Sequence, residues 1–177
     1  MQAKTATELG ALRPPSSTVP AKENSSITMR NEIIRLGQIG IKFLLESTET
    51  NGAVAMFEFT VPAGAKVPAP HSHAHYDETI YGVEGVITFT IDGKAVPIGP
   101  GESCFIRRGV VHGFNNRQSV DAKALAVVTP ALIGPEFFQE MAAIVNAGGP
   151  PDVAAIKATM LRHGLVPAPM ESATAKA

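Results

Sequence analysis

The sequence predicts an all-β domain, a sandwich or a barrel, with a pair of helices at its C-terminal end. Short β-branched and apolar runs recur at close spacing between residues 33 and 129, separated by residues typical of tight turns. Sixteen glycines and fourteen prolines among 177 residues suit many short strands joined by turns. After Pro130 the apolar residues fall at helical spacing instead.

Composition narrows the class of protein further. Hydrophobic residues make up 45% of the chain, charged residues 18%, and the net charge is −1. We expect no nucleic-acid partner, because the sequence has no cluster of lysine and arginine suited to a phosphate backbone. We also expect no membrane partner, since no apolar run could span a bilayer, and no secretion signal, since the N-terminus lacks a charged segment followed by an apolar one. A single cysteine, Cys104, excludes an intrachain disulfide and is compatible with a cytoplasmic location.

We expect three segments along the chain. Residues 1–25 are rich in Ala, Thr, Ser, Pro and Lys without periodicity, which predicts a flexible N-terminal arm. Alternatively, this arm lies against a partner subunit, and composition does not decide between the two. Residues 26–130 would form the β-barrel, and residues 131–177 the C-terminal helices and tail.

Each predicted strand is a short apolar run. The expected strands are residues 33–36, 41–45, 53–61, 78–83, 86–91, 94–98, 103–106, 110–114 and 123–129. Asn51-Gly52 and Asp92-Gly93 are strong two-residue turn signals, because these residue types tolerate positive φ. In the strand 53–61, Phe57, Phe59 and Val61 share one face.

Two helices are expected after the strands. Pro135 suits the start of the first, and Gly148-Gly149 follow its end. Asp152 is the expected N-cap of the second, which Gly164 would end. We interpret the pair as a structural cover of the barrel or a bridge between subunits. His163, in the last turn, is interpreted as unrelated to the chemistry.

Histidines gather in one short stretch. Of the five in the chain, His71, His73 and His75 alternate within five residues. In an extended segment residues two apart point the same way, so His71 and His73, or His73 and His75, can face a common point. His112, in a later predicted strand, would complete the set. Independent placement would seldom give this grouping, so we predict a metal site.

Glu78 is the nearest glutamate to these histidines. It lies five residues after His73, and in a regular strand an odd spacing would direct it to the opposite face. We therefore expect a turn or bulge near Tyr76-Asp77 that restores the phase.

Two motifs resemble those of the cupin superfamily. They are Gly64 followed by His71-x-His73-x4-Glu78-x6-Gly85, and Gly101-x5-Arg107-x-Gly109-x2-His112-x3-Asn116. The sequence departs from the family pattern in two places: six residues rather than five separate Gly64 from His71, and Arg107 stands where proline is usual. The resemblance covers roughly residues 41–129. It implies an antiparallel jelly-roll β-barrel of six to ten strands.

The resemblance also implies the ligands of the metal site. These are His71, His73, Glu78 and His112, and the spacing favours His73 over His75, which becomes a neighbour at the barrel mouth. Four ligands leave one or two positions open on an octahedral metal, which is typical of a site that acts on a substrate. We prefer Fe(II), with Mn, Ni, Cu or Zn as alternatives.

The predicted function is metal-dependent oxidation of a small organic molecule with dioxygen, similar to quercetinase-like dioxygenases, by a homodimer. Glu78 would also act as a catalytic proton acceptor. The alternatives are a metal-dependent isomerase or decarboxylase, and a non-catalytic protein that binds a small metabolite.

Five residues are candidates for the substrate pocket: Phe57, His75, Tyr76, Arg107 and Phe114. Arg107 or its neighbour Arg108 could hold a substrate carboxylate. The alternative is that both arginines are solvated or ion-paired loop residues, and that most of the aromatic residues are ordinary core.

Overall fold

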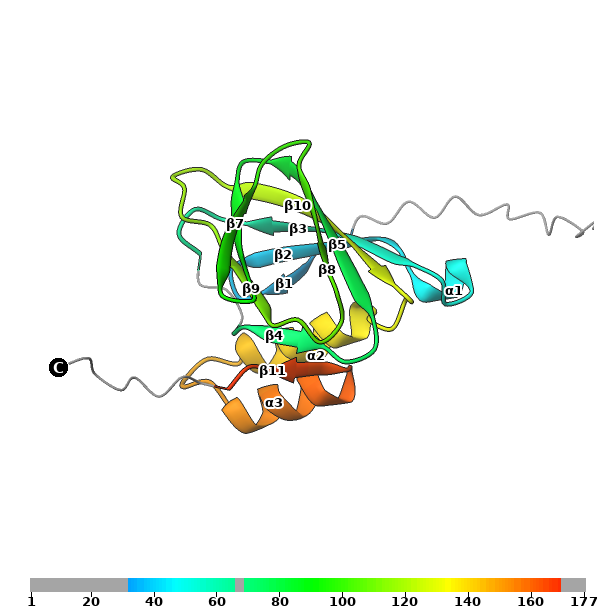
Figure 1. Cartoon of the computed structure of the whole chain (residues 1–177). Coiled ribbons are helices and arrows are strands. Elements are labelled where there is room, and N and C mark those ends of the chain that lie inside the picture. The colour runs from blue at the N-terminus through cyan, green and yellow to red at the C-terminus, as the bar shows by residue number, and fades with distance from the viewer. Residues whose placement is uncertain (1–31, 66–68, 170–177) are drawn as a thin grey trace, which may run out of the picture.

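Two antiparallel β-sheets face each other in the computed structural model, which describes residues 32–65 and 69–169 (Figure 1). Within these residues the first sheet has the strand order β1 (Ile34–Leu36), β2 (Ile39–Leu45), β3 (Ala55–Val61), β10 (Ala122–Thr129), β5 (Asp77–Glu84) and β8 (Ser103–Ile106). The second has the order β11 (Leu165–Pro167), β4 (His71–His73), β9 (His112–Asn115), β6 (Ile87–Ile91) and β7 (Lys94–Ile98). The fold is the all-β jelly-roll barrel with a C-terminal helical pair that the sequence predicts. The predicted N-terminal arm, residues 1–25, lies outside the described residues.

Large and small side chains alternate between neighbouring strands of the barrel interior. In β3 every second residue is buried, including Phe57 and Phe59. The residues opposite them on β10 are Ala126 and Ala124. Because alanine fills little volume, the phenylalanine rings extend into the space between the sheets.

The two predicted turns both contain residues with positive φ. Asp92 (φ 50°) and Gly93 (φ 74°) form the two-residue hairpin between β6 and β7. Asn51 (φ 53°) and Gly52 (φ 81°) follow a short helix, α1 (Ser47–Thr50), so they turn the chain but do not form a two-residue hairpin between β2 and β3. The helical turn forms because Glu46 and Glu49 make a capping box, each accepting a backbone N–H of the other.

The helical pair begins and ends at the predicted signals. α2 (Pro135–Val145) has Pro135 in its first turn, and in α3 (Val153–Arg162) the Asp152 side chain accepts a hydrogen bond from the Ala155 N–H at 2.9 Å. Gly164, with φ 76°, lets the chain leave the helix. None of the helices in the described residues is long and apolar enough to cross a membrane.

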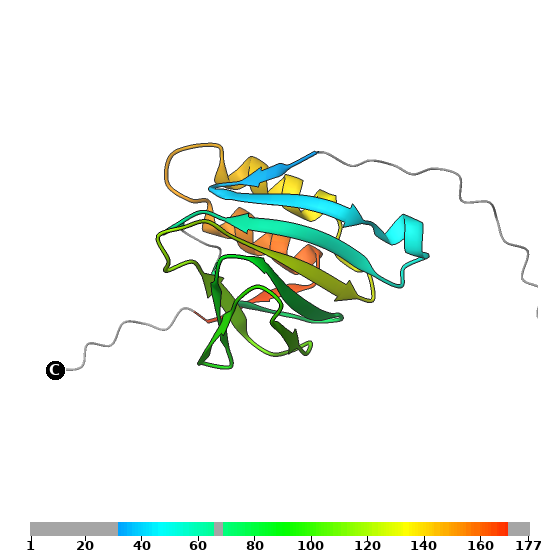
Figure 2. The same cartoon turned by 90° about the horizontal axis from the view of Figure 1, so that it is seen from above.

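These helices close one side of the barrel. α2 packs on β1, at the edge of the first sheet. After α3 the chain forms β11, which lies at the edge of the second sheet and pairs with β4, and neither of these two strands was predicted. The pair therefore lies along the opening between two sheet edges, as Figure 2 shows from above.

Gly85 offers a test of the packing between barrel strands. It has φ 63°, and an added Cβ would lie 2.5 Å from the Asp121 carbonyl oxygen and 2.9 Å from the Ala122 Cα. Gly93 has a similar φ of 74°, but an added Cβ there meets no heavy atom within 4 Å. Both alanine variants carry the strain of left-handed backbone, about 1–2 kcal/mol. We expect Gly85→Ala to lower the free energy of unfolding by about 1–3 kcal/mol more than Gly93→Ala, because only it crowds the backbone.

Urea denaturation of the two variants beside the parent protein measures this difference. Equal midpoints and slopes for both would contradict the close approach at Gly85.

Candidate metal centre

The four predicted ligands come from both sheets and meet between them. β4 carries His71 and His73, and its neighbour β9 carries His112, with His71 and His112 directly paired in register. Glu78 lies on β5, in the opposite sheet. The histidines thus come from one wall of the barrel and the carboxylate from the other.

The change of sheet replaces the turn that was expected at Tyr76-Asp77. The chain bends at Ala74 and His75, two residues earlier, and Asp77 already belongs to β5. An argument from strand phase does not apply across this bend, because Glu78 and His73 are in different strands. Glu78 reaches the centre by crossing to the facing sheet.

The distances fit a single ion. Each of His71, His73 and His112 offers one ring nitrogen within 4.8 Å of the other two. The Nε2 atoms of His71 and His73 are 3.3 Å apart, and His112 Nε2 lies 3.4 Å from Glu78 Oε2. Two ligands bound at about 2.1 Å and at right angles would be about 3 Å apart. The three histidines are therefore positioned to hold a metal ion, with Glu78 beside them.

Backbone carbonyls fix which nitrogen of each ring faces the centre. His71 Nδ1 donates to the Ala69 carbonyl at 3.2 Å, and His112 Nδ1 donates to the Val110 carbonyl at 3.0 Å. Since a carbonyl oxygen only accepts, both Nδ1 atoms carry the hydrogen. The Nε2 lone pairs are left for an ion, as is usual for histidine ligands.

Burial and mutual charge set the protonation of the centre. Burial lowers the pKa of His71 to about 4 and that of His73 to about 3, so both rings are neutral at pH 7. Burial alone would raise the pKa of Glu78, but the hydrogen bond with His112 and the charges of the histidines lower it overall. Burial alone would lower the pKa of His112, but the hydrogen bond to Glu78 and the negative charge of Glu78 raise it overall. Without an ion, His112 and Glu78 form a charged pair.

Tyr76 packs against one of the histidines of the centre. Its ring stacks on His73, with centroids 4.3 Å apart and planes inclined by 25°, and the residue is 1% exposed. Among the described residues, the Tyr76 hydroxyl and Asn115 Oδ1 are buried polar atoms that lack a hydrogen-bond partner. The stacking holds the His73 ring in place.

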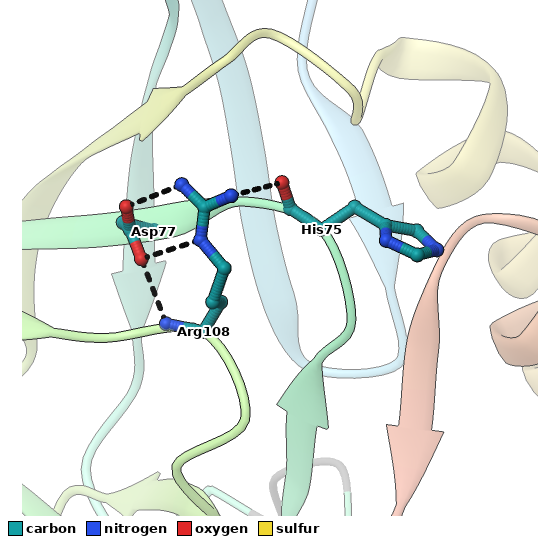
Figure 3. A network of polar contacts seen from close by, with 3 residues as sticks. All are labelled: His75, Asp77 and Arg108. Carbon is teal, nitrogen blue, oxygen red and sulfur yellow. Dashed lines mark hydrogen bonds and ion pairs between the residues drawn. The ribbon is translucent and has the colours of Figure 1, made fainter.

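An ion pair joins the two motif segments (Figure 3). Arg108 donates from Nε and Nη2 to the two Asp77 carboxylate oxygens at 3.1 and 2.7 Å, and from Nη1 to the His75 carbonyl at 3.2 Å. The Arg108 backbone N–H also donates to Asp77, at 2.8 Å, and these bonds lower the pKa of Asp77 to about 2. We call this group the Arg108 clamp. It gives Arg108 the ion-paired role that the sequence left as one of two alternatives.

A cavity of about 90 Å³ lies against the centre. Its polar lining residues are His71, Glu78 and His112. Its apolar lining residues from the barrel are Leu36, Ile39, Ile41, Phe57, Phe59, Phe89 and Phe114. Its apolar lining residues from the C-terminal segment are Ile133, Phe137, Phe138, Met141, Met160 and Leu165.

The lining differs in part from the predicted pocket. Phe57 and Phe114 line the cavity, whereas His75, Tyr76 and Arg107 do not. His75 and Arg107 are exposed, and Figure 3 shows the His75 ring directed away from the Arg108 clamp. The helical residues were expected to form a structural cover or a bridge between subunits, and none of them was expected in the pocket. Their helical spacing shows which face is apolar, but not that this face closes the barrel.

Comparisons with known proteins agree with the motifs. The family model described as "Cupin domain" matches residues 57–128. The chain is 30% identical over 93 residues to the oxalate-binding protein of Thermotoga maritima, covering 52% of this chain and 76% of that protein. It is 28% identical over 88 residues to quercetin 2,3-dioxygenase of Bacillus subtilis, covering 50% of this chain but 26% of the dioxygenase. The match therefore spans about a quarter of that enzyme's length.

Solved structures are similar to the chain as well. The crystal structure of a predicted oxalate decarboxylase from Thermotoga maritima has 29% sequence identity and a TM-score of 0.48, covering 52% of this chain and 80% of that chain.

Binding of a divalent metal should release about one proton at neutral pH. Because the pKa of His112 is raised, the ion-free protein keeps a proton there to higher pH than an ordinary imidazole does, and a metal must displace that proton. Metal affinity should consequently fall as the pH falls through the pKa of His112. Protonation of His71 and His73 should lower the affinity further only in strongly acidic solution. Calorimetric titration with Zn²⁺ in buffers of different ionisation enthalpy counts the protons, and a count of zero at pH 7 would refute the His112–Glu78 pair.

The variant His112→Ala should lose most of its metal, because one imidazole ligand disappears. We expect an affinity loss beyond the roughly 10- to 100-fold that follows from removing an outer hydrogen-bond partner of a ligand. The matched control is His75→Ala, which removes a nearby exposed histidine and should keep its metal. Elemental analysis of untagged protein measures both, and full metal retention by His112→Ala would contradict the ligand set.

Proposed function

Because the chain belongs to the cupin family, we propose that it binds one divalent transition metal and oxidises a small organic molecule with dioxygen. The proposed ligands are His71, His73, Glu78 and His112. The observation that supports this most directly is their convergence at the polar end of an otherwise apolar cavity. Structural metal sites are closed by protein ligands, whereas a site that acts on a substrate has an open position beside the ion.

The ligand set suits a catalytic ion. Four protein ligands leave two positions of a six-coordinate metal for substrate and dioxygen. We prefer Fe(II). Mn, Ni, Cu and Zn are alternatives, because imidazole and carboxylate ligands can bind all of these metals. When bound, the metal would supply Lewis acidity and, for a redox-active ion, electron transfer.

The residues of this chain have separate tasks in the proposal. Glu78 is ionised at neutral pH, because its pKa is lowered, and can accept a proton from a substrate hydroxyl or thiol. In the absence of the metal, His112 Nε2 lies 3.4 Å from Glu78 Oε2 and keeps the carboxylate beside the three imidazoles. Aromatic and aliphatic walls, among them Phe57 and Phe114, keep water away from the reacting group.

Relatives support action on, or binding of, a small molecule. One is a quercetin 2,3-dioxygenase and another an oxalate-binding protein. The second favours an alternative in which the chain binds a small metabolite through its metal without turnover. A metal-dependent isomerase or decarboxylase is the other alternative. The homodimer and the cytoplasmic location stay predictions from the sequence.

Oxygen uptake by the Fe(II)-loaded protein tests the proposal. Across a panel of flavonols, thiols and hydroxy-acids, we expect at least one compound to start uptake. Glu78→Gln should lower the rate per bound metal by on the order of 10²–10⁴, because the proton acceptor is lost. His75→Ala should leave the rate unchanged. If no compound of the panel starts oxygen uptake and the protein turns over a substrate in an anaerobic isomerase or decarboxylase assay, the proposed oxidation is rejected. The isomerase or decarboxylase alternative then replaces it.

A further inference from the structure

We propose that the C-terminal helical pair makes the cavity selective for molecules with one monoanionic polar end and an apolar body no larger than one ring. The selection by charge rests on the proposed metal function. The selection for an apolar body of limited size depends on the walls alone.

The polarity of the cavity is strongly one-sided. Its three polar lining residues, His71, Glu78 and His112, all belong to the metal centre. The remaining thirteen lining residues are apolar. A ligand with polar groups at both ends would leave one end without a hydrogen-bond partner, which is costly in an apolar environment.

Charge limits the ligand as well. No lysine or arginine of the described part of the chain lines the cavity. A divalent ion beside ionised Glu78 has a net single positive charge, so a monoanion neutralises the site. A dianion such as oxalate would leave one uncompensated negative charge among apolar walls, and burial of such a charge is unfavourable.

Size is the third limit. The cavity measures about 90 Å³, whereas an apolar cavity of about 150 Å³ accommodates benzene. One ring can enter when flexible side chains shift, and Met141 and Met160 on the helical pair are of that kind. Two fused rings exceed the space.

The helical pair sets this size. Met160 of α3 is 5% exposed and lines the cavity, while the adjacent Leu161 is 50% exposed and does not. Met141 of α2, 4% exposed, lines the same wall. Truncating a lining residue of this pair should enlarge the cavity, whereas truncating its exposed neighbour should not.

Thermal-shift and calorimetric titrations of the full chain test the proposal without requiring turnover. Toluene should raise the melting temperature of the metal-free protein, because the apolar walls alone bind it. In the Zn²⁺-loaded protein, which is redox-inert, benzoate should bind on the order of tenfold or more tightly than acetate, through burial of its ring. Oxalate should bind more weakly than benzoate.

The second arm varies the wall. Parent protein and Leu161→Ala should not bind 2-naphthoate, whereas Met160→Ala should, because its cavity is larger. Met141→Ala provides the same test from α2 if Met160→Ala does not fold.

Absence of any toluene effect, benzoate no tighter than acetate, or binding of 2-naphthoate by the parent would each overturn the proposal. Failure of the protein to bind Zn²⁺ would refute the proposed metal function instead. The toluene titration would still decide whether the apolar cavity selects its ligand.

Discussion

The interior of this barrel holds three imidazoles and a carboxylate that must satisfy one another or an ion. His73 and His112 are 4% and 3% exposed, so neither can turn to solvent for a partner. Backbone carbonyls take the Nδ1 hydrogens of His71 and His112 and leave Nε2 facing inward. The carboxylate of Glu78 then balances the one proton that the ion-free group keeps. The strands and loops around the centre keep these four side chains close enough to bind one another or an ion.

One backbone hydrogen bond and one side-chain ion pair hold the strands that carry the ligands. The Gly109 N–H donates to the His73 carbonyl at 2.8 Å, which joins the loop before β9 to the end of β4. The Arg108 clamp fixes the same loop to the start of β5 through Asp77. The two motifs are therefore linked through their loops as well as through their ligands. Arg107, which departs from the family pattern, takes no part in these bonds, and its neighbour carries the structural role.

The sequence predicts the fold, nine of the eleven strands in the described residues, and four side chains that lie close together between the sheets. The prediction succeeded there because strand periodicity, turn residues and histidine spacing are local signals. It failed for the route of Glu78, because a change of sheet at Ala74 and His75 has no local signature. It also missed β11 and the inner wall formed by Phe137 and Met160, since an amphipathic helix shows an apolar face but not what that face covers.

β11 has a consequence for where the functional unit ends. The family model stops at residue 128, yet β4 is paired on one side with β11, where Leu165 stands opposite His73. The Ala74 N–H also donates to the Gly164 carbonyl, and the Ala168 N–H to that of Pro70. A fragment cut at the family boundary would turn the ligand-bearing strand into an exposed sheet edge, open to water and to pairing with other chains. For this chain, the paired sheet that carries the histidines extends through the last described strand.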